Sequence, residues 1–281
     1  MAWMSRRTFC TAGVSVLALR GQGPALRWAL LADTHIATDP ADTNRGFNMS
    51  ENLAAVVGQI REAQVSGALV CGDLAREKGL AGDYAAFHRL IQPLLGRMPV
   101  ALALGNHDHR ANFRAEFGSP TGAVNMESHA LAVVETAPLR LLVLDSLLET
   151  NIAPGFLGQE QREWLTRFLA EAPVRPTLIF VHHTLGDGDI DLLDVSRLFD
   201  IVRGHPSVKA IIYGHSHCYR FDVYDGIHLI NLPAVGYNFA DREPVGWEEA
   251  ELTRAGGAFT LHAIGGNRMN NGRRVELTWR G

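Results

Sequence analysis

Short apolar runs that end in polar, potentially metal-binding side chains constrain the fold of this chain more than any other feature. Five such runs recur, and each has the length of a strand: 26–32, 68–71, 99–104, 177–181 and 208–213. Buried strands of a layered α/β protein end along one edge of a sheet, which is where ligands bind. The pattern therefore predicts an α/β fold whose strand ends share one site.

The side chains at these strand ends are carboxylates, a carboxamide and imidazoles. They are Asp33 and His35, then Asp73, then Asn106 with His107 and Asp108, then His182 and His183, and finally His215 and His217. Each group has a simpler explanation, since Asp caps helices and His also occurs as an ordinary core or surface residue. The simpler explanation would have to apply at five strand ends, so a shared site is the better interpretation.

The donor types suit a pair of catalytic metal ions. Two cations about 3.5–4 Å apart need a bridging carboxylate and a mixed set of oxygen and nitrogen ligands. Two Asp, one Asn and four His supply that set, and the absence of thiolate favours Fe, Mn, Zn or Co over a structural zinc ion without choosing among them. We expect Gly105, which precedes Asn106, to permit a sharp turn off its strand.

The remaining pattern alternates helices with strands. Helical spacing of apolar residues predicts helices over 50–64, with Ser50 as N-cap, and over 84–95, 112–117, 159–169 and 192–202. Residues 129–134 and 139–144 form a further predicted pair of strands. Alternating segments near the C-terminus predict antiparallel strands that close a second sheet, at 219–223, 227–232, 247–252 and 258–264.

Composition limits the classes of protein that remain. The 281 residues, 47% of them apolar, are sufficient for one substantial core. A net charge of −4 and a pI near 6.3 provide no basic footprint for nucleic acid. The cysteines Cys10, Cys71 and Cys218 lie at neither zinc-ligand nor framework spacing, and nothing in the sequence supports a bridge between Cys71 and Cys218.

The N-terminus resembles a twin-arginine export signal. Arg6 and Arg7 precede a weakly apolar stretch over 12–19. We therefore expect a signal over 1–24 and a single domain over 25–281, with the twin-arginine machinery as a partner and a periplasmic or secreted location. If the arginine pair is accidental, the protein stays cytoplasmic. No later stretch reaches the roughly 18 apolar residues of a spanning helix, so we expect no stable membrane span.

The order of the motifs D-x-H, G-D, G-N-H-D, H-H and G-H-x-H resembles the calcineurin-like metallophosphoesterase family across nearly all of 25–281. Within that family, 105–113 and 214–217 are similar to the class III cyclic-nucleotide and glycerophosphodiester phosphodiesterases. The resemblance implies a four-layer α/β/β/α sandwich with two mixed sheets. Two departures, Thr184 where proline is common and His109 where aspartate is common, are expected to shape the substrate pocket.

The resemblance also implies a role for each residue. Asp33, His35 and His217 would bind one metal ion, Asn106, His182 and His215 the other, and Asp73 both. His107 would donate to the phosphoryl oxygen or protonate the leaving alkoxide, and Asp108 would orient its imidazole.

The expected reaction is hydrolysis of a small phosphodiester by attack of a metal-bridging hydroxide. A phosphomonoesterase or a nuclease on the same scaffold is the alternative. A non-catalytic protein-binding scaffold is disfavoured because no ligand is missing from the motifs.

Overall fold

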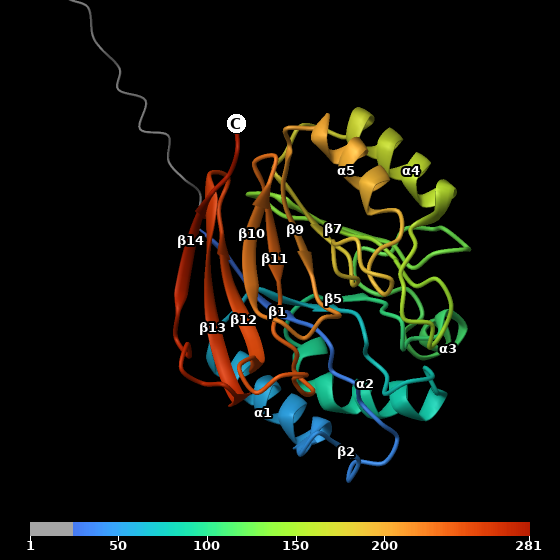
Figure 1. Cartoon of the computed structure of the whole chain (residues 1–281), viewed down its shortest axis with the longest axis vertical. Coiled ribbons are helices and arrows are strands. Elements are labelled where there is room, and N and C mark those ends of the chain that lie inside the picture. Colours follow the sequence, from blue (N-terminus) through green and yellow to red (C-terminus); the bar gives the residue numbers. More distant parts are fainter. Residues whose placement is uncertain (1–24) are drawn as a thin grey trace, which may run out of the picture.

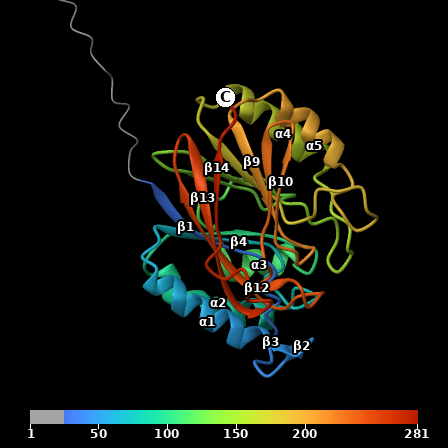
Figure 2. The same ribbon diagram turned by 60° about the vertical axis from the view of Figure 1, so that its left-hand side comes forward.

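Two six-stranded sheets face each other in the computed structural model, which describes residues 25–281 (Figure 1). The expected export signal, residues 1–24, lies outside the described residues. Helices α1 and α2 cover one outer face and α4 and α5 cover the other, as the turned view also shows (Figure 2). The predicted four-layer α/β/β/α sandwich is confirmed.

The first sheet has the strand order β14-β13-β12-β1-β4-β5. Its strands are β1 (Leu26–Leu31), β4 (Gly67–Cys71), β5 (Val100–Ala103), β12 (Pro244–Leu252), β13 (Gly256–Gly266) and β14 (Arg274–Thr278). Strands β1, β4 and β5 run parallel, whereas β12, β13 and β14 pair antiparallel. The three parallel strands deliver their carboxyl ends to the same edge of the sheet.

The second sheet has the order β10-β11-β9-β8-β7-β6. Its strands are β6 (Ala132–Glu135), β7 (Arg140–Val143), β8 (Thr177–Phe180), β9 (Val208–Tyr213), β10 (Arg220–Tyr224) and β11 (Ile227–Asn231). Strands β7, β8, β9 and β11 are parallel neighbours, and β6 and β10 form antiparallel edges. This sheet is therefore also mixed.

The helices pack through apolar faces that recur with helical spacing. They are α1 (Met49–Glu62), α2 (Ala81–Leu95), α3 (Arg110–Phe117), α4 (Gly158–Glu171) and α5 (Val195–Arg203). Leu53, Val56 and Ile60 of α1 are fully buried against the first sheet, and Leu198 and Val202 of α5 are buried against the second. A short hairpin, β2 (Thr43–Asn44) with β3 (Phe47–Asn48), precedes α1.

Alternating side chains of both sheets fill the space between them. Trp28 and Leu30 of β1 meet Phe180 of β8 and Ile212 of β9 in this layer. Burying such large apolar side chains contributes about 1.5–3 kcal/mol each. The packing therefore fixes the two sheets relative to each other and places their strand ends face to face.

Three predictions from the sequence need correction. The N-cap of α1 is Asn48 and not Ser50, because the Asn48 side chain accepts a hydrogen bond from the amide of Glu51 at 3.0 Å. Helix α5 begins at Val195, so residue 192 precedes it. The C-terminal strands do not all close the second sheet: β10 and β11 do, whereas β12 and β13 extend the first beside β1.

Two further points concern the cysteines and the membrane. Cys71, which is buried, and Cys218 are both free thiols. None of the helices within 25–281 combines the length and the apolar character that crossing a bilayer would need.

Candidate metal centre

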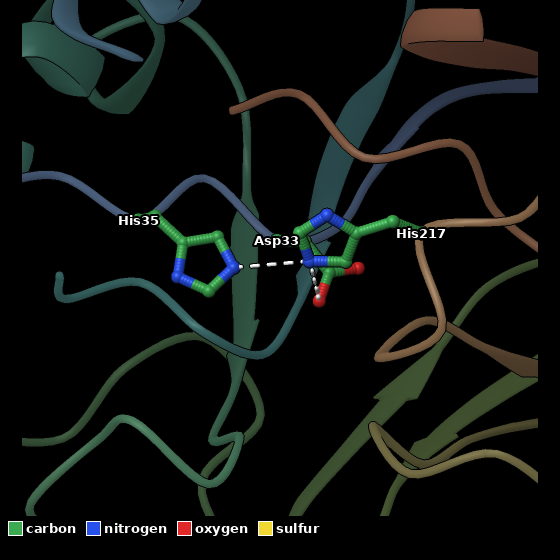
Figure 3. Close-up of side chains that lie close together, drawn as sticks. All are labelled: Asp33, His35 and His217. Carbon is green, nitrogen blue, oxygen red and sulfur yellow. Dashed lines mark hydrogen bonds and ion pairs between the residues drawn. The ribbon is translucent and has the colours of Figure 1, made fainter. Parts of the chain in front are cut away.

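The loop after β1 and the loop after β9 bring together the first candidate set of ligands. Asp33, His35 and His217 are buried, and one ligand atom of each lies within 4.8 Å of the others (Figure 3). The Nε2 atoms of His35 and His217 lie 3.1 Å apart, and Nε2 of His217 lies 3.5 Å from Oδ1 of Asp33. Two imidazole nitrogens facing each other beside a carboxylate is the arrangement that a shared cation requires.

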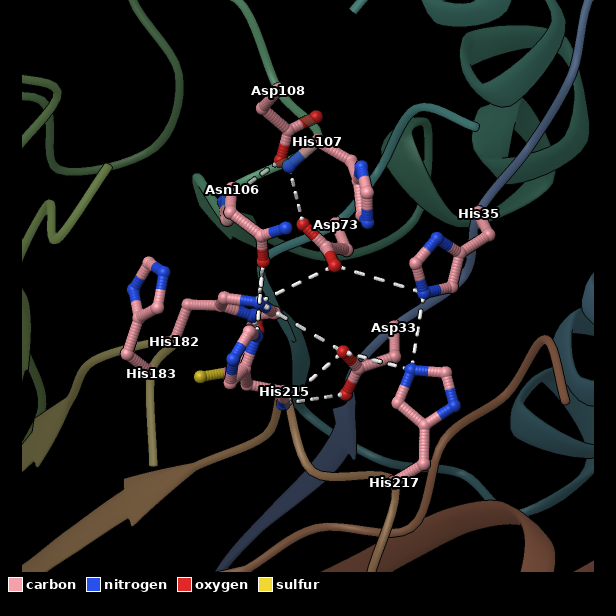
Figure 4. A network of polar contacts seen from close by, with 12 residues as sticks. Asp33, His35, Asp73, Asn106, His107, Asp108, His182, His183, His215 and His217 are labelled. Atoms are coloured by element: carbon pink, nitrogen blue, oxygen red, sulfur yellow. Dashed lines mark hydrogen bonds and ion pairs between the residues drawn. The ribbon is translucent and has the colours of Figure 1, made fainter. Parts of the chain in front are cut away.

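A second set of candidate ligands lies beside the first and follows the ends of β4, β5, β8 and β9. Asp73, His182 and His215 form it, and the Oδ1 atom of Asn106 lies 3.0 Å from Nδ1 of His215 and 3.3 Å from Nε2 of His182 (Figure 4). Oδ2 of Asp73 lies 3.4 Å from Nε2 of His182 and 3.6 Å from Nε2 of His35. One Asp73 oxygen thus faces a ligand of each set.

Each of the four imidazoles uses its other ring nitrogen to donate a hydrogen bond to a backbone carbonyl. The pairs are His35 Nδ1 with Arg76 at 3.3 Å, His182 Nδ1 with Cys71 at 2.9 Å, His217 Nδ1 with Tyr237 at 2.5 Å and His215 Nε2 with Ile190 at 3.0 Å. Such bonds fix the tautomer and aim the remaining lone pair into the site. The donor set therefore fits metal ions.

The backbone is strained at five of the seven candidate ligands. Asp33, His35, Asp73, His215 and His217 have φ between 50° and 68°, a region that residues other than glycine seldom adopt. Strain of this kind costs about 1–3 kcal/mol per residue and persists where the surroundings impose it. Here it aims five candidate ligands at one point.

Burial and the carboxylates set the protonation of the site. Burial lowers the pKa of His35 to about 3 and that of His215 to about 4, so both imidazoles stay neutral near neutral pH. Burial also opposes a charge on His182, but the Asp73 carboxylate outweighs it and raises the pKa of His182 to about 9. Despite burial, His182 holds the pKa of Asp73 well below its usual range. The site thus combines ionised carboxylates with neutral imidazoles at His35 and His215, whereas His182 would release its proton when a metal ion binds.

Glycine is required at positions 105 and 214 because side chains of the candidate ligands approach the backbone closely there. A Cβ atom at Gly105 would overlap Oδ1 of Asp73 and lie 2.7 Å from Nε2 of His182. A Cβ atom at Gly214 would lie 2.5 Å from Oδ2 of Asp33. A turn does begin at Gly105, whose carbonyl accepts a hydrogen bond from the amide of Asp108 at 3.2 Å, but this turn needs no positive φ at the glycine. The missing side chain leaves room for the candidate ligands.

His107 lies beside both sets and is partly exposed. Its ring centroid is 5.3 Å from that of His35, its amide donates to Oδ1 of Asp73 at 2.9 Å, and its Nδ1 donates to the carbonyl of Glu77 at 3.0 Å. Its Nε2 remains for another partner. The Glu77 carbonyl therefore orients this imidazole.

Asp108 has a different function from the expected one. Its carboxylate does not orient His107; it accepts hydrogen bonds from the amides of Gly105, Leu74 and Ala75 and from the hydroxyl of Tyr84 at 3.0 Å. Burial raises the pKa of Asp108 to about 6. Asp108 joins the loop after β4 to the loop after β5, and these loops carry Asp73 and Asn106.

Five of the seven candidate ligands line a cavity of about 440 Å³: His35, Asp73, Asn106, His215 and His217. His109 and Thr184, which the sequence suggested as pocket residues, are not among the lining residues, and His109 caps α3 instead. His183 lies beneath the site, with its Nδ1 2.7 Å from Oγ of Ser146. Sequence reasoning missed five other lining residues because they lie on irregular segments without a motif: Asn151, Ala153, Ile190, Tyr237 and Phe239.

Comparison with known proteins shows the family of this chain. The family model of the calcineurin-like phosphoesterases matches residues 26–219. The chain belongs to this family. The chain is accordingly a metal-dependent phosphoric ester hydrolase. The Asp and His cluster offers the ligand types that a divalent metal ion needs.

Two curated relatives are informative. A probable cyclic nucleotide phosphodiesterase of Rhodopseudomonas palustris is 31% identical over 216 residues, which cover 72% of this chain and 75% of the relative. The 3',5'-cyclic adenosine monophosphate phosphodiesterase CpdA of Escherichia coli is 29% identical over 273 residues, 91% of this chain and 96% of the relative. Both alignments extend over most of the chain.

Solved structures share the fold at low sequence identity. A dimetal phosphatase of Danio rerio has a TM-score of 0.69 at 17% identity and covers 92% of this chain and all of its own. A purple acid phosphatase of yellow lupin has a TM-score of 0.70 at 14% identity and covers 92% of this chain and 54% of its own. The similarity extends to the fold alone.

Proposed function

We propose that this protein hydrolyses a small phosphodiester with two metal ions. Asp33, His35 and His217 would hold one ion and Asn106, His182 and His215 the other, and Asp73 would serve both. The observation that carries this proposal is the set of four imidazoles, each held by a backbone carbonyl so that its other nitrogen faces buried carboxylates. The relatives' names as cyclic nucleotide phosphodiesterases support a diester substrate.

When bound, the ions would lower the pKa of the attacking water and offset charge on the phosphoryl oxygens. The identity of the ions is open among Fe, Mn, Zn and Co. His107 would supply a separate function, because its Nδ1 is engaged with Glu77 and its Nε2 has no hydrogen-bond partner within residues 25–281. In its imidazolium form His107 carries a proton on both nitrogens, and we assign the transfer of the Nε2 proton to the leaving alkoxide, which leaves a neutral imidazole with Nδ1–H on Glu77. Asp108 acts as a positioning residue for the loops that carry Asp73 and Asn106.

The cavity lining favours a diester over the alternatives. Within the described residues, neither Arg nor Lys lines the cavity, so it offers no cationic side chain for the second charge of a phosphomonoester. Ile190 at the rim is flanked by the exposed Asp189 and by Asp191, which repel a long polyanion such as nucleic acid. A small diester carries one negative charge, so it needs no cationic side chain for a second charge, and it is too short to be repelled as a polyanion is.

Activity with chromogenic substrates tests the proposal. Full-length protein loaded with Mn²⁺ should hydrolyse bis(p-nitrophenyl) phosphate faster than p-nitrophenyl phosphate, and a chelator should abolish both activities. Faster hydrolysis of the monoester would favour the phosphomonoesterase. No hydrolysis by protein that holds metal would favour the non-catalytic scaffold.

Two variants separate metal binding from proton donation. His107→Ala should keep its metal and lose activity by about 10²–10⁴-fold, because it removes only a proton donor. Asp73→Ala should lose metal and activity together. Metal content by mass spectrometry and turnover are measured on the same samples, and equal metal loss in both variants would make His107 a ligand.

We also propose that the protein is exported by the twin-arginine route to the periplasm or beyond. The support is the Arg6-Arg7 pair before an apolar stretch, with residues 25–281 as the exported domain. Replacing both arginines with lysine should hold the protein in the cytoplasm, as measured by cell fractionation. Unchanged fractionation would contradict export by this route.

A further inference from the structure

Ile190 lines the metal cavity with an exposed aliphatic side chain. It lies in the loop between β8 and α5, shares the cavity with His35, Asp73 and His215, and leaves 55% of its surface accessible. Water therefore covers much of an apolar side chain beside the candidate metal ligands. A ligand group that displaces this water gains binding free energy if it is itself apolar.

Hydrogen bonds of the main chain hold Ile190 in this position. Its carbonyl accepts the hydrogen bond from Nε2 of His215 at 3.0 Å, and the carbonyl of the next residue, Asp191, accepts one from the amide of Gly155 at 3.0 Å. Because the contact with His215 uses only the main chain, the Ile190 side chain can be changed while His215 keeps its orientation. The effect of the side chain on specificity is therefore separable from metal binding.

The wall of the cavity that contains Ile190 adjoins the second set of candidate ligands. Asn151 lines the same cavity, and its amide donates to the carbonyl of Asn106 at 2.6 Å. His107 lies instead beside His35 of the first set, with ring centroids 5.3 Å apart. Since the leaving alkoxide is assigned to His107 above, Ile190 is available to the ester group that stays on phosphorus.

The charges near Ile190 favour an uncharged group at this wall. Asp189 is exposed, Asp191 follows, and within residues 25–281 neither Arg nor Lys lines the cavity. The acidic neighbours repel a second anionic group, and no cationic side chain is present to bind one. Phe239 also lines the cavity, but its ring is already stacked on His217, with centroids 4.1 Å apart. Ile190 thus supplies the apolar surface that a substrate can cover.

We propose that Ile190, together with Ala153 of the same cavity, determines specificity for the ester group that stays on phosphorus, and that this group is an alkyl chain. This substrate class rests on the proposed phosphodiesterase reaction and adds an apolar substituent to its diester. An alkyl chain that covers Ile190 removes apolar surface of both from water. Each methylene group that is fully buried contributes about fourfold to affinity. A charged or strongly hydrated group gains nothing from this contact.

Two substrates that differ only in the retained ester group test this subsite. Methyl p-nitrophenyl phosphate and butyl p-nitrophenyl phosphate share the leaving group and the single negative charge, so the ratio of their kcat/KM values reports the alkyl chain alone. Full-length protein loaded with Mn²⁺ should hydrolyse the butyl ester with a kcat/KM at least about tenfold higher. Equal values for the two esters would overturn the alkyl subsite and would leave the proposed phosphodiesterase reaction supported.

Binding without turnover separates the subsite from the reaction. Methylphosphonate and butylphosphonate contain a carbon–phosphorus bond, which ester hydrolysis does not cleave. Calorimetry with the same protein should show butylphosphonate binding at least about tenfold more tightly. If neither ester is hydrolysed, the proposed phosphodiesterase reaction is wrong and the phosphonate ratio still decides the subsite. Equal affinities for the two phosphonates would overturn it.

Ile190→Thr keeps a β-branched side chain and the carbonyl that accepts the hydrogen bond from His215, but it replaces an ethyl group with a hydroxyl. It should lower kcat/KM more for the butyl ester than for the methyl ester, so that both ratios fall to about threefold or less. Metal content, measured by mass spectrometry, should match that of the wild type. An unchanged ratio, or equal weakening of both esters, would overturn the proposal.

Leu193→Thr is the matched control. Leu193 lies in the same loop and is equally exposed, at 55%, but it does not line the metal cavity. This variant should keep both wild-type ratios. A fall in the ratios equal to that of Ile190→Thr would show a general effect of losing apolar surface from the loop and would overturn the assignment to Ile190.

Discussion

Because Gly105 has no side chain, two candidate ligands, Asp73 and His182, can approach each other closely. Asp73 comes from the end of β4 and His182 from the end of β8, so they belong to different sheets. Both reach the space that a Cβ atom at residue 105 would fill. The glycine of this motif is thus a packing requirement of the metal site.

Gly105→Ala should therefore lose metal with little change in overall fold. The added methyl group displaces Asp73 or His182, whose positions are set by backbone contacts. We expect at least a tenfold loss of metal affinity and of activity, checked by metal titration and by circular dichroism. Gly58→Ala is the control, since a Cβ atom there has nothing within 4 Å and lies within α1. It should bind metal normally and gain up to about 1 kcal/mol of stability; equal metal loss in the two variants would contradict the argument.

The sequence predicts which polar residues gather at the site, because each follows a buried strand and parallel strands end together. It predicts their partners less well. Asp108 looks like a companion of His107 because it is adjacent in the chain, yet its carboxylate binds amides 33 and 34 residues away. Phe239 lies on an irregular segment where neither spacing nor composition signals a site. Contacts of this kind depend on how loops cross, which no local pattern encodes.

At the scale of elements, the C-terminal strands show a limit of what the sequence pattern predicts. Alternation predicts β12 and β13 as strands but does not specify the sheet they join. Strand β12 pairs with β1, so Glu248 faces the inter-sheet layer opposite Leu30. Its Oε1 accepts a hydrogen bond from the Tyr219 hydroxyl at 2.9 Å, and its Oε2 has no partner within the described residues. A buried carboxyl in this position is protonated.

Burial raises the pKa of Glu248 from 4.5 to about 8, which gives stability a defined pH dependence. Between these values the folded state binds more protons than the unfolded state. The contribution of this residue to stability is therefore fully present below pH 4.5 and falls as the pH rises towards 8, by up to about 1.4 kcal/mol per pH unit.

Glu248→Gln should remove this slope, because the amide stays neutral. Urea unfolding of wild type and variant between pH 5 and pH 8 should give a difference in unfolding free energy that shifts in favour of the variant as the pH rises. The exposed Glu276→Gln serves as control and should follow the wild-type curve. Parallel curves for wild type and Glu248→Gln would mean that Glu248 ionises normally in the folded protein.

At the scale of the whole molecule, the candidate ligands come from both sheets. Asp33, His35, Asp73 and Asn106 follow strands of the first sheet, whereas His182, His215 and His217 follow strands of the second. Metal binding at the proposed site would therefore cross-link the two halves of the sandwich at the edge where the inter-sheet layer ends. Without metal, the site leaves imidazole nitrogens and carboxylates facing one another in a buried space.

Removing metal should therefore lower the thermal stability of the whole protein. A ligand that binds only the folded state stabilises it by about 2.7 kcal/mol at one hundred times its Kd. For a chain of this size that corresponds to a Tm shift of about 5–10 °C. Calorimetry of full-length protein should give a Tm that rises with the logarithm of Mn²⁺ concentration, while Asp73→Ala, which loses a ligand facing both sets, should show a much smaller rise. If the Tm of the wild type is the same in chelator and in Mn²⁺, the cluster does not join the two sheets through metal.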